Sequence, residues 1–391
     1  MRRVLFVHNG PLFRDAHGRL YGMHFTNQIV ERYRYLGQQV TFLMREQRLD
    51  GDPAGYSRID AEDFTFVAVP NVVGPVARAR YRRVANQRIS RAVAAADIVV
   101  ARLPSATASL AVDWARRLNT PCLTECVGCN WDALWNYNWK GKLGAGWYSW
   151  QQRRRIRAAP YVIYVTQEFL QRRYPTLGQC AAISNVELPL SEEGVLERRL
   201  ARIEALAADS RPLHLATVGN VAVPYKAQGD VIRAVAELRK SGVEVVYHLV
   251  GEGDPSRLVR LARRLGLESQ VVIHGAMPHS RVFDFLEAMD LYLQPSRQEG
   301  LPRALIEAMS RGLPSLGSRA GGIPELLPQA RTFRAGDLGA IARLIAQLRS
   351  PELQREDARR NVQRAQDFDP RHLGQKRRAF FDAFLAAEGL A

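Results

Sequence analysis

The chain has 391 residues, of which 47% are hydrophobic and 24% charged, and its formal net charge is +16. These fractions are ordinary for a globular protein, and a chain of this length should form two domains with ample cores. No apolar stretch approaches the roughly 18 residues of a transmembrane helix, and the apolar run after Met1 is too short for a signal peptide. Four cysteines favour a reducing compartment over a disulfide scaffold. We therefore expect a cytoplasmic protein without a membrane span.

Almost all of the positive charge comes from arginine. The lysines are confined to five positions, namely Lys140, Lys142, Lys226, Lys240 and Lys376. A basic surface suits anionic partners, which include nucleic acid, acidic lipid and phosphorylated substrates. A compositional bias towards arginine would explain the same charge without any partner.

Short apolar runs alternate with helical segments along the whole chain. A first series of strands is predicted at 3–8, 40–44, 64–69, 97–101, 121–125 and 161–165. A second series is predicted at 213–218, 245–250, 271–274, 290–294 and 314–317. Continuous apolar strands separated by helices are typical of parallel sheets that are covered on both faces.

The segment 191–212 between the two series is polar, rich in Ala and Arg, and has no strand pattern. We therefore predict two doubly wound, Rossmann-like α/β domains in tandem, at 1–195 and 196–370. Ligands of such sheets bind beyond the carboxyl ends of the strands, so the cleft between the domains is the expected site. The amphipathic segment 371–391 is predicted to be a C-terminal helix that can cross back to the first domain.

Three cysteines in "CLTECVGC", Cys122, Cys126 and Cys129, have a C-x3-C-x2-C spacing. This spacing resembles the cluster-binding loop of radical enzymes that use S-adenosylmethionine. Those enzymes usually have an aromatic residue before the last cysteine, where this chain has Gly128. We therefore expect buried free thiols instead of a metal cluster.

Two glutamates, Glu299 and Glu307, lie eight positions apart in "RQEGLPRALIEAMSRGLPS" (297–315). Glu299 is predicted in the turn after a buried strand and Glu307 in the next helix, whose first turn suits Pro302. Eight helical residues rise about 12 Å, whereas the carboxyl groups of a glycosidase pair lie roughly 5–10 Å apart. The spacing therefore favours two anchors that grip separate parts of one long ligand. A solvated helix face is the alternative explanation for Glu307.

A lysine and three glycines lie at the ends of neighbouring strands. Lys226, in "TVGNVAVPYKAQGDVIRAVAEL" (217–238), precedes an amphipathic helix and follows a strand that ends at Gly219. A lysine beside a helix N-terminus suits a phosphate group. Gly251 and Gly275 end the next two strands, where a missing side chain lets a ligand approach the backbone. Together with the glutamate turn, these residues place four strand ends around one cleft.

The stretch from about 213 to 330 resembles the C-terminal domain of the retaining family 4 glycosyltransferases, which have the two-domain GT-B fold. The resemblance is carried by the E-x7-E spacing in "EGLPRALIEAMSRGLP" and by "AGGIPELL" (320–327). It implies a metal-independent, retaining transferase that has no cofactor and takes its sugar from a nucleotide sugar, UDP- or GDP-linked.

The resemblance also implies residue roles. Glu307 would accept hydrogen bonds from the ribose hydroxyls, Glu299 would hold the transferred sugar, and Lys226 would lie beside the diphosphate. Glu299 and Lys226 are thus the predicted catalytic residues. The other donor contacts are expected from the strand-end turns, the segment lining the base and the start of the glutamate helix: Gly219, Asn220, Gly251, Gly275, Ala276, Met277, Gly300, Leu301, Pro302 and Arg303.

The sequence departs from the family pattern at two positions. The family usually has an arginine six residues before the lysine, where this chain has Asn220, whose neutral amide cannot supply a second charge to the diphosphate. Either another arginine such as Arg303 reaches the diphosphate, or donor binding is weaker. The family often has a histidine in the turn after strand 121–125, where this chain has Val127, so a histidine-assisted role is not expected there.

The acceptor side is expected in the first domain. Gly10 and Gly22 are the predicted loop glycines after the first strand. Arg102 and Glu125 end two other strands, so they are candidates to face the cleft. Ordinary strand-end charges are the alternative.

The segment 131–157, "WDALWNYNWKGKLGAGWYSWQQRRRIR", contains five of the six tryptophans and ends in four arginines, Arg153, Arg154, Arg155 and Arg157. Aromatic rings beside basic side chains suit contact with an anionic membrane surface. Stacking on single-stranded nucleic acid or sugar rings, and packing of a helix pair on the sheet, are alternatives. Together with "YVIYVTQEFLQRRYPT" (161–176), the segment resembles bacterial capsular and exopolysaccharide glycosyltransferases, whose acceptors are commonly lipid-linked saccharides at the cytoplasmic membrane face.

We therefore predict a retaining glycosyltransferase of polysaccharide biosynthesis that moves a sugar from a nucleotide-sugar donor to a lipid-linked or glycan acceptor. It would be cytoplasmic, peripheral on the inner face of the plasma membrane, and without a nucleic-acid partner. One alternative is a basic nucleic-acid-binding protein, which would leave the glutamate turn unused. Another is a non-catalytic, membrane-associated protein on a GT-B-like scaffold.

Overall fold

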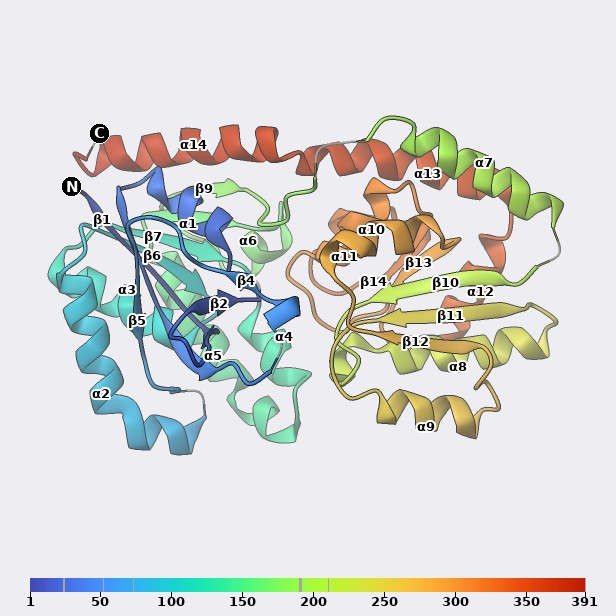
Figure 1. Ribbon diagram of the computed structural model, residues 1–391, viewed down its shortest axis with the longest axis horizontal. Coiled ribbons are helices and arrows are strands. Elements are labelled where there is room, and N and C mark those ends of the chain that lie inside the picture. The colour runs from blue at the N-terminus through green and yellow to red at the C-terminus, as the bar shows by residue number, and fades with distance from the viewer. Residues whose placement is uncertain (24, 52, 73, 190–191, 210, 391) are drawn as a thin grey trace.

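The computed structural model describes residues 1–23, 25–51, 53–72, 74–189, 192–209 and 211–390. The chain folds into two α/β domains that lie side by side, each built on its own sheet (Figure 1). The expected boundary segment 191–212 includes residues 191 and 210, which lie outside the described ranges.

The first sheet has nine strands: seven follow the order β4-β2-β1-β6-β7-β8-β9, β3 also pairs with β1, and β5 pairs with β3. Its strands are β1 (Arg3–Arg14), β2 (Leu20–Gly22), β3 (Gln39–Arg48), β4 (Ser57–Arg58), β5 (Phe64–Ala68), β6 (Ile98–Leu103), β7 (Cys122–Cys126), β8 (Tyr161–Tyr164) and β9 (Gln179–Ala182). Its helices are α1 (Asn27–Arg34), α2 (Pro75–Ala94), α3 (Ala106–Leu118), α4 (Asn130–Trp135), α5 (Trp139–Arg157) and α6 (Phe169–Arg173), with a 3-10 turn η1 (Pro53–Gly55).

Strand β1 changes its pairing in the middle. Val4 to Val7 pair in parallel with both β3 and β6, and the register with β3 then shifts between Val7 and Pro11. The residues beyond the shift continue beside β3 and pair antiparallel with β2. Residues 8–10 therefore form a bulge at the level where the neighbouring strand β6 approaches its carboxyl end.

The second sheet has six parallel strands in the order β12-β11-β10-β13-β14-β15. They are β10 (Leu213–Val218), β11 (Val245–Val250), β12 (Val271–Gly275), β13 (Leu291–Gln294), β14 (Ser315–Ser318) and β15 (Thr332–Phe333). The helices are α7 (Val195–Ala208), α8 (Gln228–Lys240), α9 (Ser256–Arg264), α10 (His279–Glu287), α11 (Arg303–Ser310), α12 (Leu338–Gln347), α13 (Pro351–Ala365) and α14 (Pro370–Ala387). Short 3-10 turns are η2 (Pro224–Lys226), η3 (Ile323–Glu325), η4 (Gln329–Arg331) and η5 (Gln366–Phe368).

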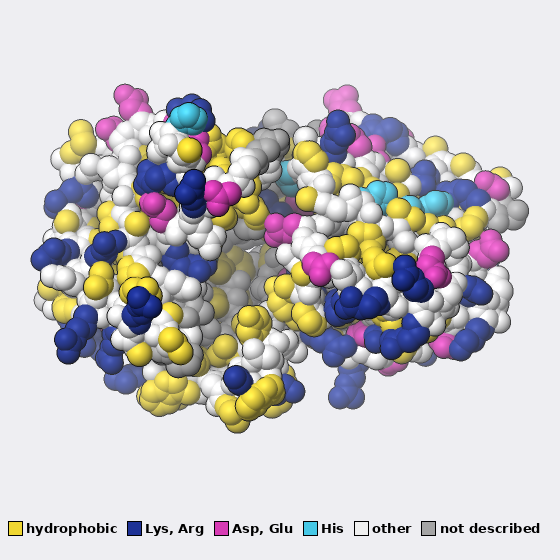
Figure 2. All heavy atoms as spheres, turned by 60° about the horizontal axis from the view of Figure 1, so that its bottom comes forward, with side chains coloured by type: hydrophobic (Ala, Val, Ile, Leu, Met, Phe, Trp, Pro, Cys, Tyr) yellow, Lys and Arg dark blue, Asp and Glu magenta, His cyan; other side chains and the backbone are white. Residues whose placement is uncertain are grey.

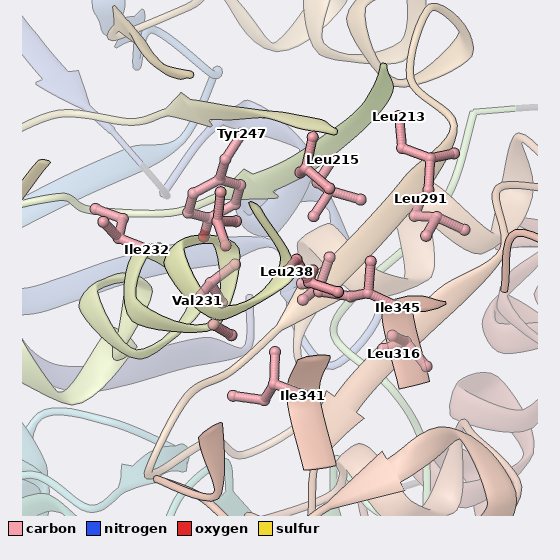
Figure 3. Close-up of a cluster of buried hydrophobic side chains, with 14 of the residues drawn as sticks. Leu213, Leu215, Val231, Ile232, Leu238, Tyr247, Leu291, Leu316, Ile341 and Ile345 are labelled. Carbon is pink, nitrogen blue, oxygen red and sulfur yellow. The ribbon is translucent and has the colours of Figure 1, made fainter. Parts of the chain in front are cut away.

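Both faces of each sheet are buried. In the first domain Leu5 and Val7 belong to one hydrophobic cluster, whereas Val4 and Phe6 belong to another on the opposite face. This alternation follows from the two-residue period of a strand. In the second domain, side chains of β10 and β11 pack against α8 and α12 in one cluster, part of which is drawn in Figure 3.

The last helix, α14, returns to the first domain, along which it runs in Figure 1. Phe381 and Phe384 are fully buried in the cluster that contains Val4 and Phe6. Arg377 donates from Nη1 to Glu187 Oε1 at 2.8 Å, which fixes the helix to the segment between the domains. None of the helices in the described ranges is both long and apolar enough to cross a membrane.

Candidate active site

An ion pair forms at the carboxyl edge of the second sheet. Lys226 ends η2 after strand β10, and Glu299 lies in the loop after the adjacent strand β13. The Lys226 ammonium lies 2.7 Å from Glu299 Oε1, and the two side chains are 20% and 11% exposed. The structure therefore brings the two predicted catalytic residues together as one half-buried, charge-assisted pair.

A buried chain of hydrogen-bonded side chains, here called the relay, holds the Glu299 carboxylate in place. Gln294 Nε2 donates to Glu299 Oε1 at 2.9 Å and to Ser296 Oγ at 2.9 Å. Tyr292 donates its hydroxyl to Gln294 Oε1 at 2.7 Å, which fixes the orientation of the amide. Burial raises the pKa of the Tyr292 phenol well above its ordinary value, so this group remains a proton donor. No local pattern in the sequence indicates this relay, because its members meet only in the fold.

Glu307 lies on α11 with its carboxylate nearly buried, and its partner is a histidine from a different helix. His279 Nε2, from the first residue of α10, lies 2.8 Å from Glu307 Oε1. The His279 side chain is 57% exposed, whereas that of Glu307 is 5% exposed. An exposed imidazole can swing away at little cost, so this pair can open to a ligand hydroxyl while the carboxylate stays in place.

The glutamate turn packs closely against two other loops at glycine positions. A Cβ on Gly300 would lie 2.3 Å from the Val127 carbonyl oxygen, in the first domain. A Cβ on Gly321, where φ is +58°, would lie 2.0 Å from the Glu299 carbonyl oxygen. Gly322 N also donates to the Gly300 carbonyl at 2.8 Å. The turn is therefore fixed by backbone contacts on both sides and lies where the two domains meet.

The predicted strand-end glycines form a ladder across the sheet. Gly219 N donates to Val250 O, and Gly251 N donates to Gly275 O, both at 2.8 Å. Gly251 and Gly275 adopt positive φ values of +157° and +73°. A Cβ on Gly251 would lie 2.1 Å from the Gly219 carbonyl oxygen, so the loops after β10 and β11 meet without side chains between them. The following residues, Ala276 and Met277, are exposed and half-buried respectively.

Asn220 serves its own loop instead of supplying a charge. Its Oδ1 accepts from Ala222 N at 3.0 Å and its Nδ2 donates to Glu252 Oε1 at 3.3 Å. Arg303 is exposed at the start of α11, directly after Leu301 and Pro302.

A second arginine, Arg297, lies closer to the lysine in the hydrogen-bond network. Its backbone N donates to the carbonyl of Tyr225, the residue before Lys226, at 2.7 Å. Its guanidinium contacts Asp230 Oδ2 at 2.6 Å and is 44% exposed. Arg297 could not be found from the sequence pattern, because it lies 71 residues from Lys226 in the chain and the fold brings the two loops together.

Arg102 and Glu125 are buried, so neither presents a free charge to the cleft. They lie opposite each other in the parallel register of β6 and β7. Arg102 Nε donates to Glu125 Oε2 at 2.8 Å, and Tyr33 donates its hydroxyl to Glu125 Oε1 at 2.8 Å. Burial would raise the pKa of Glu125, but the charges of Arg102 and Arg32 and the hydrogen bonds from Tyr33 and Arg102 together outweigh it and hold that pKa below its ordinary value. The two side chains thus form a buried ion pair inside the first domain, and their place on the acceptor side stays a prediction.

The predicted glycines of the first domain allow tight backbone contacts. Gly10 N donates to His8 Nδ1 at 2.9 Å inside the β1 bulge. A Cβ on Gly22 would lie 1.9 Å from the Phe25 carbonyl oxygen. Both glycines therefore shape the loop after the parallel part of β1.

None of the four cysteines, all of which lie in the described ranges, forms a disulfide. Cys126 and Cys129 are buried, Cys122 is partly exposed and Cys180 is exposed. Burial raises the pKa of the Cys122 thiol to about 12 and that of Cys126 further, so neither is a thiolate at neutral pH. Within the described ranges, no group of three or more His, Cys, Asp or Glu residues is arranged to hold a metal ion.

The tryptophan-rich segment lies mostly on the surface. Trp135, Trp139, Trp147 and Trp150 are 43–68% exposed, and Leu143 is 80% exposed. Lysine and arginine side chains lie over several of these rings, for example Lys142 over Trp135 at 5.4 Å. Hydrophobic and basic side chains gather along the forward edge of the first domain in Figure 2. These four tryptophan rings therefore do not pack on the sheet, whereas the ring of Trp131 packs against the core of the first domain.

Residues 212–350 match the family model described as glycosyl transferases group 1. Protein CapJ of Staphylococcus aureus is 24% identical over 348 residues, which cover 88% of this chain and 85% of CapJ. The amylovoran biosynthesis glycosyltransferase AmsK of Erwinia amylovora is 32% identical over 152 residues, which cover 36% of this chain and 37% of AmsK.

Solved structures resemble the whole chain in fold. Anabaena HepE in complex with UDP-glucose superposes with a TM-score of 0.65 at 16% identity, covering 99% of this chain and 100% of HepE. WaaG, a glycosyltransferase involved in lipopolysaccharide biosynthesis, gives a TM-score of 0.64 at 16% identity, covering 95% of this chain and 98% of WaaG. The chain therefore has the GT-B fold of these glycosyltransferases and carries a glycosyl transferases group 1 domain at residues 212–350.

Proposed function

We propose that this protein is a retaining glycosyltransferase that moves a sugar from a nucleotide-sugar donor to a lipid-linked or glycan acceptor in polysaccharide biosynthesis. The observation that carries the proposal is the half-buried pair of Lys226 and Glu299 at the carboxyl edge of the second sheet. The similarity to CapJ and AmsK supports a role in polysaccharide biosynthesis. HepE, which has the same fold, was solved with UDP-glucose, and this supports a nucleotide sugar as the donor.

The charges of the site fit the bond that has to break. Cleavage of a sugar–diphosphate bond develops positive charge on the sugar and negative charge on the leaving phosphate, which preorganised cations and N–H groups stabilise. Lys226 would turn from Glu299 to the diphosphate, while the N–H groups at the start of α11 and the guanidinium of Arg297 or Arg303 add positive potential. Glu299 would then accept hydrogen bonds from the sugar, and Glu307 from the ribose. In this scheme the cations are side chains, and no metal ion is required.

The configuration at the reacting carbon would be retained if the acceptor hydroxyl attacks the same face of the sugar from which the diphosphate departs. The acceptor hydroxyl would approach beside the donor phosphate, whose oxygen would take the hydroxyl proton as the new glycosidic bond forms and the sugar–phosphate bond breaks. The loop at Val127, where a histidine is common in family 4, contacts Gly300 through its backbone carbonyl. We therefore assign no proton transfer to a side chain of this loop.

Thermal-shift screening of UDP- and GDP-sugars tests the donor, because a ligand that binds the folded state raises the melting temperature. We expect one nucleotide sugar to stabilise the protein and to support transfer to a lipid-linked saccharide. Glu299→Gln should lower the transfer rate sharply while retaining binding of the free nucleotide. Indifference to every nucleotide sugar, combined with oligonucleotide binding that falls steeply with salt, would instead support the nucleic-acid alternative.

The same proposal places the protein on the inner face of the cytoplasmic membrane, through the exposed rings of 131–157. The charge and aromatic content of this surface match an anionic lipid headgroup region. Replacing Trp139 and Trp147 by alanine should weaken sedimentation with anionic vesicles, whereas Val259→Ala, at an exposed apolar residue of α9 in the second domain, should not. Equal sedimentation of all variants would leave the segment without a membrane role.

A further inference from the structure

The bulge of β1 presents a second set of cationic and donor groups that the donor site does not use. Arg45, on β3 opposite the bulge, donates from Nε to the Asn9 carbonyl oxygen. Its side chain is partly buried, and it forms no ion pair with any carboxylate in the described ranges. Burial lowers its pKa, as expected for a guanidinium that has lost water without gaining a counter-charge.

His8 lies in the same bulge and supplies a further donor. Its Nδ1 accepts from Gly10 N at 2.9 Å, so in the neutral ring the proton is on Nε2. Burial, together with the positive charge of Arg102, lowers the pKa of His8 to about 3, so the ring is neutral at physiological pH. Arg102 itself is neutralised by Glu125. The groups left for a ligand are therefore the guanidinium of Arg45 and the Nε2–H of His8, which both donate.

The position of this bulge relative to the donor site can be estimated from the sheet. Val127, which contacts Gly300 of the glutamate turn, directly follows β7. β7 and β1 are separated by β6, and β3 lies one strand beyond β1. With strands about 4.8 Å apart, His8 and Arg45 lie about 10–15 Å across the sheet edge from the donor turn. This is the scale of one sugar ring followed by a diphosphate.

We propose that Arg45 and His8 bind the phosphate of the acceptor, so that the acceptor is a phosphorylated saccharide whose reacting hydroxyl lies at the donor turn. An arginine fork and a neutral N–H donor match phosphate oxygens, and neither group can accept a hydrogen bond from a neutral hydroxyl. The phosphate belongs either to a polyprenyl diphosphate or to a soluble sugar phosphate. The inference deepens the proposed function and rests on it for the identity of the substrate as an acceptor.

Anion binding at Arg45 can be measured without donor or transfer. In a Lys226→Ala background, which weakens the donor phosphate site, calorimetric titration with inorganic pyrophosphate should detect a site that Arg45→Gln weakens at least tenfold. Arg48→Gln is the matched control, because Arg48 lies three residues further along β3, is exposed and pairs with Asp50 at 2.8 Å. Thermal melts of each variant confirm that it is folded.

The outcomes separate this proposal from the proposed function. Equal pyrophosphate affinity with and without Arg45, or no binding at all in the Lys226→Ala background, overturns the anion site even if transfer activity exists. A polyprenyl diphosphate in micelles is titrated in the same way. If it binds more tightly than pyrophosphate and this binding depends on Arg45, the phosphate belongs to a lipid-linked acceptor. If the two bind equally, it belongs to a soluble sugar phosphate.

Once the donor is known, a kinetic comparison gives an independent result. Arg45→Gln should raise KM for a phosphorylated acceptor at least tenfold and leave the donor KM unchanged, whereas Arg48→Gln should change neither. An unchanged KM for the phosphorylated acceptor would overturn the assignment of Arg45.

Discussion

Replacing Lys226 by alanine should lower kcat/KM for donor-dependent transfer by about 10- to 150-fold. In the structure the Lys226 ammonium makes one charge-assisted contact, 2.7 Å long, from a side chain that is 20% exposed. In the reaction the same ammonium would contact the leaving diphosphate. A hydrogen bond to a charged group is worth about 1.5–3 kcal/mol, and about 1.4 kcal/mol corresponds to a factor of ten in rate.

Lys240→Ala is the control for this experiment, because Lys240 ends α8, Lys226 lies two residues before that helix, and each lysine pairs with one glutamate. The Lys240 ammonium lies 2.9 Å from Glu237, but its side chain is 70% exposed. An exposed pair of this kind contributes at most about 1 kcal/mol to stability, and it is remote from the strand ends. Initial rates measured with saturating acceptor and varied donor should therefore fall for Lys226→Ala and stay within twofold for Lys240→Ala.

The double variant Lys226→Ala/Glu299→Gln adds a test of coupling. Because the two side chains contact each other, their effects should not add. If Lys226→Ala retains a rate within twofold of the wild-type protein, or if the two single effects simply multiply, the paired site is not the catalytic one.

Three further predictions concern other parts of the molecule. Glu125→Ala leaves the Arg102 guanidinium buried without a counter-charge, and urea unfolding should show a loss of about 3–5 kcal/mol. Gly300→Ala places a Cβ 2.3 Å from the Val127 carbonyl, so transfer should fall sharply while nucleotide binding, followed by thermal shift, persists. Burial lowers the pKa of His248 to about 4, whereas in the unfolded chain this histidine binds a proton near pH 6.5. The free energy of unfolding should therefore decrease as pH falls from 6.5 to 4. The decrease should be smaller in His248→Asn.

The strands were predictable from the sequence because nearly all of them are continuous apolar runs. All eleven predicted strands are present, with ends that agree within two residues except where β1 and β3 continue to Arg14 and Arg48. The missed strands, such as β2 (Leu20–Gly22), are two to four residues long. A periodic pattern cannot be recognised over so few positions, and β2 forms only because β1 continues past its bulge and offers a free edge.

The candidate site was predictable only where its residues lie in one local motif. Glu299 and Lys226 could be identified beside strand ends, but their partners come from other parts of the fold. Gln294 reaches Glu299 because strand β13 turns its last side chain towards the loop, and His279 reaches Glu307 because α10 packs beside α11. Arg102 and Glu125 show the same limit, since only the register of β6 and β7 reveals that they pair with each other inside the domain.

Under the proposed function, the ion pair between Lys226 and Glu299 would favour the whole donor over its parts. A nucleotide sugar offers phosphate oxygens to the ammonium and hydroxyl groups to the carboxylate, so both partners exchange one contact for another. A free nucleotide would attract Lys226 but leave Glu299, whose side chain is 11% exposed, with Gln294 as its remaining partner. Such a loss costs free energy because a buried charge is left undercompensated. In the proposed reaction, re-formation of the pair would favour release of the nucleotide after the sugar has left, and product release would thus depend on the contact that binds the donor.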